Sequence, residues 1–298
     1  MDTVNFTHPE RLLRDEPLAK YTAARLGGAA DFVYVAREST REVSEVVQTA
    51  WKQNIAVRVL GGGANVLVSD HGFRGLVVIN KVSEAAFKES QVVVTSGYSL
   101  TILARKCASR GLAGFEWAAS VPGTVGGAVV NNAGAHGGDM ASNLHTATIC
   151  DAEKGVQVLT KADLAFDYRS SLLKHRADRR FLVLMATLNL QSGEPAKINA
   201  KIDEFIAYRK RTQPPGASLG SIFKNPHGDY AGRLIESLGL KGYAVGGAQV
   251  SPVHANFFIN TGKATASDYY ALIQHVQKRV YEATGVMLET EIEVLGEI

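Results

Sequence analysis

Near the N-terminus, the spacing of apolar residues changes twice over a short stretch. DFVYVA, residues 31–36, and AVRVL, residues 56–60, are short apolar runs typical of strands. Between them, apolar residues recur at the spacing of a helix: Val43, Val46, Val47, Ala50 and Trp51. Ser39 and Glu42 have the spacing of a capping box, which predicts that the helix begins there. The pattern predicts a β-α-β unit that ends in the glycines 61–63.

A second block repeats this pattern loosely. QVVVTSG, residues 91–97, predicts a strand, and apolar residues of the next segment predict a helix: Leu100, Leu103, Ala104 and Cys107. A long glycine-rich segment follows, SVPGTVGGAVVNNAGAHGG, residues 120–138. Further strands are expected at residues 66–70, 75–80, 146–152, 155–160 and 181–190. Helices and strands mixed in this way predict an α+β (mixed α/β) fold.

A change of composition marks a domain boundary near QSGEPAK, residues 191–197, where Ser, Gly and Pro follow an apolar strand. We expect residues 1–192 to form one region with two lobes, residues 1–82 and 83–192, and residues 193–298 to form a smaller domain. In the smaller domain we expect helices at residues 198–210, 230–240 and 267–284, and strands at residues 254–260 and 287–296.

Composition excludes several classes of protein. With 298 residues, 46% of them hydrophobic, the chain can fill a sizeable core. The 32 basic and 29 acidic residues leave a net charge of +3, which indicates neither a nucleic-acid nor a membrane partner. No apolar run is long enough for a signal peptide or a membrane span, so we expect a cytoplasmic protein. Cys107 and Cys150 lack the spacing of a zinc site or redox pair, so we expect reduced core residues and no metal.

The stretch GASLGSIFKNP, residues 216–226, contains two serines, and either could be the functional one. Ser218 lies in a G-x-S-x-G pattern, the nucleophile elbow of serine hydrolases. An elbow needs a strand before the serine and a helix directly after it, whereas prolines 214 and 215 precede Ser218 and the stretch ends in another proline. We therefore interpret Ser218 as a loop residue and favour Ser221.

The first glycine run is not a Rossmann site, because VLVSD after Asn65 predicts a strand where that site needs a helix. A cradle of backbone amides for a pyrophosphate remains possible without a helix, and so does a plain tight turn. The second segment is harder to explain as a connector. Counted together with the residues just upstream, it contains seven glycines, at positions 114, 123, 126, 127, 134, 137 and 138. Close contact with a large flat ligand would account for them.

Motifs from these segments follow one another along the chain: YTAARLGGAADFVYVA, LGGGANVLVSD, GFEWAASVPGTVGGAVVNNAGAHG, YRSS, GSIFKNP, HANFFIN and LETEIEVLG. In this order they resemble the UDP-N-acetylenolpyruvoylglucosamine reductases, flavoproteins of bacterial peptidoglycan precursor synthesis and so of cell wall biogenesis, shape and division. The resemblance runs from about Tyr21 to Gly296. It implies a two-lobed FAD-binding domain of the vanillyl-alcohol-oxidase/PCMH type at residues 1–192 and a substrate domain at residues 193–298.

The resemblance also implies a set of FAD contacts. Non-covalent binding is expected, because Ala64 and Asn65 stand where relatives with covalent flavin often carry a histidine. The pyrophosphate would meet Gly61, Gly62, Gly63, Ala64 and Asn65. The flavin would meet Ser120, Pro122, Gly123, Thr124, Gly126, Gly127, Asn132 and Gly134.

The family reaction moves a hydride from NADPH through FAD to the enolpyruvyl double bond of a UDP-sugar, which gives UDP-N-acetylmuramate. Arg169 matches the arginine that faces the substrate carboxylate, Glu291 the glutamate that assists the same charge, and Ser221 the proton donor. Spacing alone would place Glu289, Glu291 and Glu293 on one strand face, so the choice of Glu291 rests on the resemblance. The implied substrate residues are Tyr168, Arg209, Lys224, Asn225, His254 and Asn256, with Arg211 as an alternative to Arg209.

Three positions depart from the family pattern, namely Ala64, Leu219 and Thr290, and the chain lacks the insertion of the longer family type. We expect the shorter type, acting as a monomer on small molecules only. One alternative is another FAD-dependent oxidase or dehydrogenase with the same FAD fold, which would leave GSIFKNP and LETE unexplained. A second is a non-catalytic nucleotide-binding module, which would carry no flavin.

Overall fold

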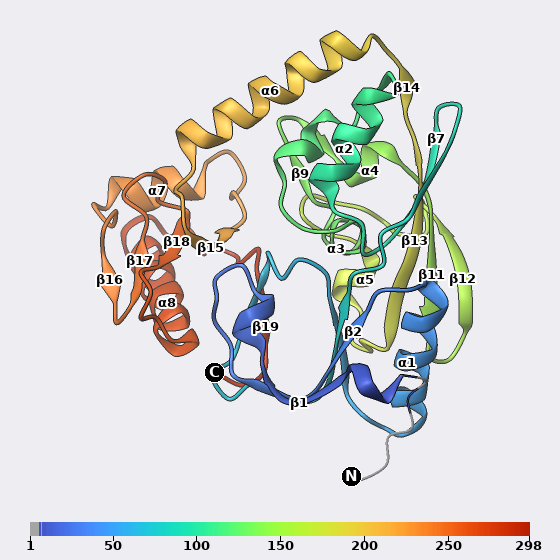
Figure 1. The fold of residues 1–298 in the computed structure, drawn as a ribbon. Coiled ribbons are helices and arrows are strands. Elements are labelled where there is room, and N and C mark those ends of the chain that lie inside the picture. The colour runs from blue at the N-terminus through green and yellow to red at the C-terminus, as the bar shows by residue number, and fades with distance from the viewer. Residues whose placement is uncertain (1–5, 7) are drawn as a thin grey trace. The chain divides into compact units, whose positions relative to one another are not determined.

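The computed structural model describes residue 6 and residues 8–298, and its chain forms two compact units (Figure 1). The first unit comprises the chain up to Arg14 with residues 32–62 and 75–208, and the second comprises residues 15–31, 63–74 and 209–298. These units do not follow the predicted division after residue 192. Two N-terminal segments belong to the second unit, and most of the helix after the predicted boundary belongs to the first.

The predicted β-α-β unit is present. Its helix α1, Thr40–Lys52, connects β2, Ala29–Ala36, to β3, Val57–Leu60. A four-stranded sheet has the order β1-β2-β5-β3, with β1 at Leu12–Pro17 and β5 at Phe73–Asn80, and β3 runs parallel to β5. The buried face of α1 carries the apolar residues that predicted the helix.

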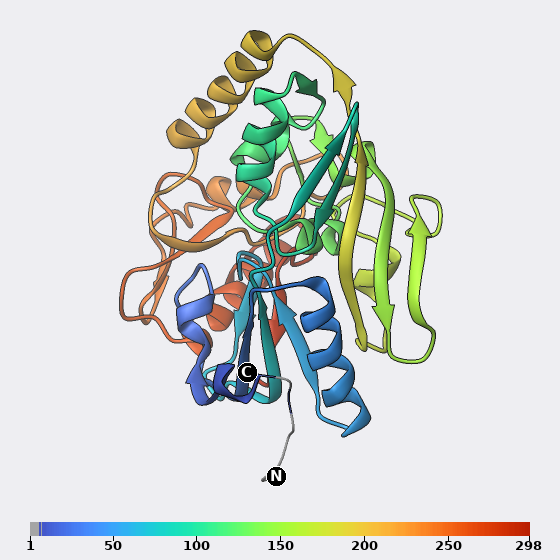
Figure 2. The same cartoon turned by 45° about the vertical axis from the view of Figure 1, so that its right-hand side comes forward.

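An antiparallel five-stranded sheet lies in the first unit, where β11, β12 and β13 run side by side (Figure 2). Its order is β12 (Gly155–Thr160), β11 (Leu144–Asp151), β13 (Phe181–Asn189), β7 (Gln91–Thr95) and β6 (Ala85–Lys88). Alternate side chains enter different cores: Ile149 and Val183 pack with α2 and α3 residues, whereas Cys150 and Leu182 pack with α1 residues. The central strands β11 and β13 are therefore buried on both faces and contribute side chains to two cores.

The glycine-rich segment, residues 120–138, does not form one continuous loop. Short elements follow one another through it: η3 (Glu116–Ser120), α3 (Val125–Asn131), β9 (Gly134–Ala135), β10 (Gly138–Asp139) and α4 (Met140–Asn143). Small side chains let α3 pack close to β13, which explains why a helix forms despite two glycines. The remaining elements of this unit are η1 (Pro9–Arg11), α2 (Leu100–Ser109), β8 (Leu112–Ala113), α5 (Leu172–His175) and β14 (Gln191–Ser192).

A second antiparallel sheet of four strands organises the second unit. Its order is β15 (Ala217–Ser221), β18 (Phe257–Asn260), β17 (Ala248–Val250) and β16 (Ala244–Val245). The long helix α8, Ala266–Thr284, packs on β16 and β17. It begins with a capping box between Thr265 and Asp268 and ends at Gly285 in the left-handed conformation, φ 71°. The unit also holds η2 (Leu18–Tyr21), β4 (Val66–Val68), α7 (Ala231–Ser237) and β19 (Glu293–Leu295), and α6 (Pro195–Thr212) has residues in both units.

Two expectations about the last third of the sequence are wrong. Ser218 is not a loop residue, because it lies within β15 and pairs with Ile259. The final strand is shorter than predicted and covers only Glu293–Leu295, since the chain changes partner along this stretch. Thr290 bridges to Phe223, whereas Glu293–Leu295 pairs with β4 in parallel. Glu289, Glu291 and Glu293 therefore do not share one face of a regular strand.

Both cysteines are buried and free of disulfides, as predicted. Burial raises the pKa of the Cys107 thiol to about 12, so this sulfur stays protonated at neutral pH. No helix within residues 8–298 is long and apolar enough to cross a membrane.

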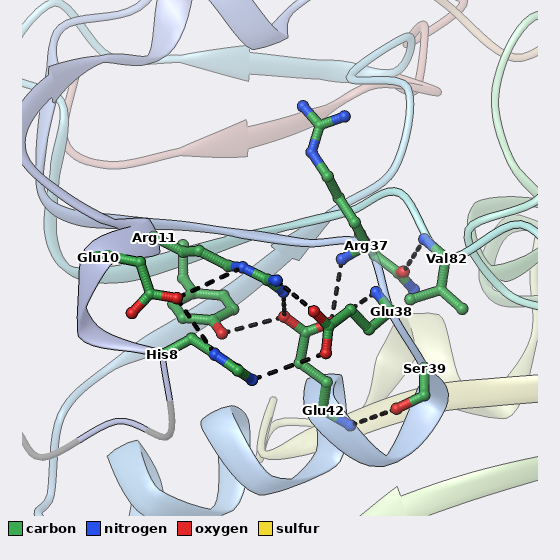
Figure 3. A network of polar contacts seen from close by, with 10 residues as sticks. His8, Glu10, Arg11, Arg37, Glu38, Ser39, Glu42 and Val82 are labelled. Atoms are coloured by element: carbon green, nitrogen blue, oxygen red, sulfur yellow. Dashed lines mark hydrogen bonds and ion pairs between the residues drawn. The ribbon is translucent and has the colours of Figure 1, made fainter.

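The capping box at α1 is only half formed. Ser39 Oγ accepts a hydrogen bond from the Glu42 amide at 3.1 Å, but the Glu42 carboxylate does not return to Ser39 (Figure 3). One carboxylate oxygen instead accepts Arg11 Nη1 at 2.6 Å and the Tyr34 hydroxyl at 3.0 Å. The other accepts the amides of Arg37 at 3.1 Å and Glu38 at 2.7 Å. Glu42 therefore ties the segment before β1 to the start of α1.

The surroundings of Glu42 fix its charge. Burial alone would raise the pKa of this carboxyl, but the Glu38 amide, Arg11, the Tyr34 hydroxyl and the Arg37 amide together lower it below its ordinary value. A carboxyl whose pKa is lower in the folded state stabilises the fold above the pKa of the unfolded state. That contribution disappears as pH falls through the folded pKa.

We expect Glu42→Gln to lower the free energy of unfolding by about 1–3 kcal/mol at pH 7. Both oxygens of the native carboxylate accept hydrogen bonds, whereas the new side chain places an NH₂ group against hydrogen-bond donors at one of these positions. The difference should shrink as pH falls below about 4, where the wild-type carboxyl also takes up a proton. Urea unfolding at several pH values measures this. Glu45→Gln, at an exposed pair with Arg41, is the control and should change stability little. An equal loss at pH 7 and at about pH 2–3 would contradict the assigned role of the charge.

Candidate functional site

In the first unit, the two glycine segments lie in direct contact. A Cβ added to Gly61 would lie 2.1 Å from Thr124 Oγ1, and one added to Gly62 would lie 3.0 Å from the Gly123 Cα. Side chains at 61 and 62 would push the segments apart, so only glycine permits this approach. The structure thus brings together two sets of predicted FAD contacts that are far apart in the sequence.

The other glycines of the second segment fall into two groups. A Cβ at Gly126 would lie 2.9 Å from Ser96 Cβ, and one at Gly134 would lie 2.5 Å from the Gly138 carbonyl oxygen, so protein packing explains both. Gly127 differs, because it is exposed in the first turn of α3 and a Cβ there would meet only Thr124 Oγ1, at 3.9 Å. Glycine in a helix costs about 1 kcal/mol relative to alanine. Packing against the described residues does not explain Gly127.

Ser120 lies at the end of η3 and is buried, while the nearby Pro122 is exposed. The Ser120 hydroxyl lies 3.0 Å from Nε2 of His136, whose ring stacks on Phe205 with centroids 4.1 Å apart and planes 3° apart. Sequence reasoning missed His136. It is the one aromatic residue within the second glycine segment, and that contrast was the available signal.

Arg169 projects from a tight turn in which Asp167 and Ser170 exchange two backbone hydrogen bonds, of 3.1 and 3.0 Å. Its own backbone is left-handed, with φ 54°, and Nη2 donates to the Gly134 carbonyl at 2.7 Å. The guanidinium also lies over the exposed ring of Tyr168, 5.5 Å from its centroid. The structure therefore places Arg169 beside the second glycine segment, inside the same unit as its partners.

Asn132 stabilises the turn that carries Arg169. It is 3% exposed and ends α3 in the left-handed conformation, φ 44°. Its Nδ2 donates to the Asp167 carbonyl at 2.9 Å and to Asp139 Oδ2 at 3.2 Å, and its Oδ1 accepts the Ala141 amide at 2.9 Å. The side chain therefore joins the turn of Arg169 to the end of α3.

In the second unit, the end of the first glycine run contacts the segment that carries Glu291, just before β19. Gly63 has φ 58°, and a Cβ there would lie 2.0 Å from the Tyr21 carbonyl oxygen. Ala64 is half-buried. Asn65 Nδ2 donates to the Glu291 carbonyl at 3.2 Å, and the Asn65 carbonyl accepts the Glu293 amide at 2.9 Å.

Ser221 ends β15, and the three residues after it are bound from both sides. The Glu291 amide donates to the Ile222 carbonyl at 2.8 Å, and the Lys224 amide donates to the Glu289 carbonyl at 2.9 Å. On the other side, the Ile222 amide donates to the Asn256 carbonyl at 2.9 Å. The structure thus gathers the predicted residues Ser221, Lys224 and Glu291 around one short segment.

The predicted substrate residues near this segment differ in their burial and in their bonds to the rest of the protein. Lys224 Nζ binds Glu289 Oε1 at 2.5 Å, and Lys224 keeps only 12% of its side chain exposed. Asn225 is exposed and accepts the Ala231 amide at 3.1 Å through Oδ1. Arg209 is half-buried in the last turn of α6, where burial lowers the pKa of its guanidinium.

His254 and Asn256 face inward. Burial lowers the pKa of His254, with the positive charge of Lys241 adding to the effect, so the ring is neutral at pH 7. Its Nδ1 accepts the Asn256 amide at 3.2 Å. Asn256 is 3% exposed, and its side chain bonds to the backbone of Phe223 through both polar atoms.

Together, the two units offer different chemistry. The first supplies a glycine-lined backbone surface and an arginine, which suit a flat anionic cofactor and a carboxylate. The second supplies a hydroxyl, a lysine and carboxylates on two hydrogen-bonded segments, which suit proton transfer. Among residues 8–298, no three His, Cys, Asp or Glu side chains gather as metal ligands.

Comparison with known proteins identifies this combination. The profile of an FAD binding domain matches residues 32–161, and that of the UDP-N-acetylenolpyruvoylglucosamine reductase C-terminal domain matches residues 212–295. The second match accounts for the last third of the chain, which another FAD-dependent oxidase or dehydrogenase with the same FAD fold would leave unexplained.

Two relatives named UDP-N-acetylenolpyruvoylglucosamine reductase resemble nearly the whole chain. The protein from Listeria welshimeri is 40% identical over 285 residues, 95% of each chain. That from a Synechococcus species is 42% identical over 291 residues, 96% of this chain and 94% of its own. The crystal structure of UDP-N-acetylenolpyruvylglucosamine reductase from Thermus caldophilus superposes with a TM-score of 0.81 at 33% identity, over 96% of this chain and 98% of that one. The chain belongs to the UDP-N-acetylenolpyruvoylglucosamine reductase family of FAD-dependent oxidoreductases.

Proposed function

We propose that this protein uses NADPH to reduce the enolpyruvyl group of UDP-N-acetyl-3-O-(1-carboxyvinyl)-glucosamine, which gives UDP-N-acetylmuramate, in the cytoplasm. One observation carries the proposal: the segment Ser221–Lys224 is hydrogen-bonded to the segment of Glu291 within one unit. That arrangement supports a proton donor, a cation and a carboxylate acting on the same substrate group.

Non-covalently bound FAD would supply the hydride transfer, from NADPH to the terminal carbon of the double bond. The first glycine run and the second glycine segment would hold it through the backbone contacts of Gly61, Gly62, Gly123 and Gly127. Gly63, Ala64 and Asn65 are the other residues that would meet the pyrophosphate. Asn132 would act indirectly, by holding other residues in place, because its described hydrogen bonds join the turn of Arg169 to the segment after α3.

Hydride addition leaves negative charge on the neighbouring carbon and its carboxylate. Arg169 would neutralise that carboxylate with a planar, permanently charged fork. Glu291 would share a proton or hydrogen bond as the charge develops. Tyr168, beneath the guanidinium, would limit how far Arg169 can turn.

The carbon that carries the charge must then take a proton. Ser221 would donate it from the hydroxyl, because an enolate-like carbon is basic enough to accept a proton from so weak an acid. Lys224, three residues on, would ease the transient alkoxide, while Glu289 holds its ammonium group. Arg209, Asn225 and His254 would bind the UDP-sugar.

Replacing Ser221 by alanine tests the acid. We expect NADPH to reduce the flavin of S221A at the wild-type rate, and we expect reoxidation by the enolpyruvyl UDP-sugar to fall by about 10²–10⁴, the usual contribution of a general acid. Anaerobic stopped-flow absorbance at the flavin bands follows both half-reactions. Ser218→Ala, on the same strand, is the matched control and should leave both rates unchanged. Equal loss of both half-reactions in S221A would remove Ser221 from this role.

Replacing Gly127 by alanine tests the cofactor surface, because two expected effects have opposite signs. The apoprotein should gain about 0.5–1 kcal/mol in free energy of unfolding, since alanine favours the helix. FAD affinity should fall by between about 5- and 100-fold, since a methyl group would overpack the contact. Urea unfolding of the apoprotein and FAD titration measure the two quantities. Unchanged affinity with higher stability would show that this face of α3 does not meet FAD.

A further inference from the structure

We propose that Asn256 is a positioning residue for Ser221: its amide clamps the backbone of Phe223 and so sets the direction of the serine hydroxyl two residues earlier. The inference rests on the proposed function, in which Ser221 donates a proton. The sequence suggested instead that Asn256 contacts the substrate. Its surroundings point to a different task.

Both polar atoms of the Asn256 side chain are used on a single residue. Oδ1 accepts the Phe223 amide at 3.0 Å, and Nδ2 donates to the Phe223 carbonyl at 2.8 Å. Asn256 is 3% exposed and Phe223 1% exposed, so water does not replace these bonds. A side-chain amide thus takes the place of a neighbouring strand at this point.

The clamp matters because the regular ladder is interrupted just before Ser221. Strand β15 pairs with β18 at Ala217 and Ser218, the register then shifts, and Ser221 pairs with Phe257, the residue after Asn256. Gly220, directly before Ser221, is left-handed, with φ 77°. The regular part of the strand therefore does not set the backbone of Ser221 by itself, and the direction of the hydroxyl depends on Phe257 and on what holds the residues that follow.

Asn256 is itself firmly held. Its amide donates to Nδ1 of the neutral His254, and its carbonyl accepts the Ile222 amide at 2.9 Å. The opposite edge of the clamped segment is occupied by the backbone of residues 289–291. Asn256 thus contacts residues 222 and 223 with three polar groups, two of the side chain and the main-chain carbonyl.

Strand β18, which begins directly after Asn256, ends in a matched asparagine. Asn260 Nδ2 donates to the Ala24 carbonyl at 2.9 Å, and its Oδ1 accepts the amides of Gly262 at 2.8 Å and Ala264 at 3.2 Å. Its side chain therefore makes the same kinds of bond, but none of them to residues 221–224. A variant of Asn260 separates general loosening of this sheet from a displaced serine.

The first experiment compares the NADPH-reduced holoenzymes of Asn256→Ala, Asn260→Ala and wild type. We expect reoxidation of N256A by the enolpyruvyl UDP-sugar to slow by between about 10- and 100-fold, the scale of a misplaced reacting group. Its solvent isotope effect should rise in D₂O, because proton donation becomes rate-limiting. Flavin reduction by NADPH should remain at the wild-type rate in both variants, and N260A should reoxidise like wild type.

Asn256→Asp supplies a second test that does not depend on N256A folding well. A neutral carboxyl can accept the Phe223 amide and donate to the Phe223 carbonyl, as the native amide does, whereas a carboxylate cannot donate. Burial should raise the pKa of the new carboxyl, so the neutral form persists into the mildly acidic range. We expect N256D to reoxidise slowly at pH 8 and to recover towards the wild-type rate near pH 5.5. Asn260→Asp should show no such recovery.

Two results would overturn the inference while leaving the proposed function intact. One is wild-type reoxidation in N256A when S221A is slow. The other is an equal slowing in N256A and N260A with no change in isotope effect and no recovery of N256D at low pH. If S221A itself reoxidises normally, the proposed acid is wrong, and the inference falls with it.

Discussion

Backbone hydrogen bonds from two distant segments hold residues 222–224, and the chemistry of the second unit depends on them. Asn256 binds one edge of this short segment and residues 289–291 bind the other. Neither partner is near it in sequence. The segments that carry Ser221, Lys224 and Glu291 come together because buried amides and carbonyls must find partners. The side chains that would react are thus placed by main-chain requirements.

In the first unit, distant segments come together through glycines, which have no side chain. Gly61 and Gly62 let one loop touch the other, and Gly127 leaves a helix turn bare where packing does not demand it. Arg169 then reaches the second segment from a turn that Asn132 holds. Both units therefore rely on asparagine side chains to join backbone segments that no regular strand or helix connects.

Much of this could be predicted from the sequence where a residue acts through its own neighbours. Val43 to Trp51 predicted α1, and the glycine runs predicted backbone approach. The failures involve partners far away in the chain. Glu42 completes a bond set with Arg11 instead of a capping box, Thr290 pairs with Phe223 and so shortens the final strand, and residues 63–74 join a unit built mainly from the C-terminal third. Spacing along the sequence carries no information about such pairings, and the choice of Glu291 needed a family resemblance.

The parallel pairing of β4 with β19 has a consequence for how the protein folds. Val66–Val68 and its partner Glu293–Leu295 lie far apart along the chain. The two strands can meet only after all the residues between them have been synthesised, and this long separation gives the pairing a high contact order. The end of the first glycine run, which bonds to residues next to β19, therefore cannot reach its final hydrogen bonds before that point.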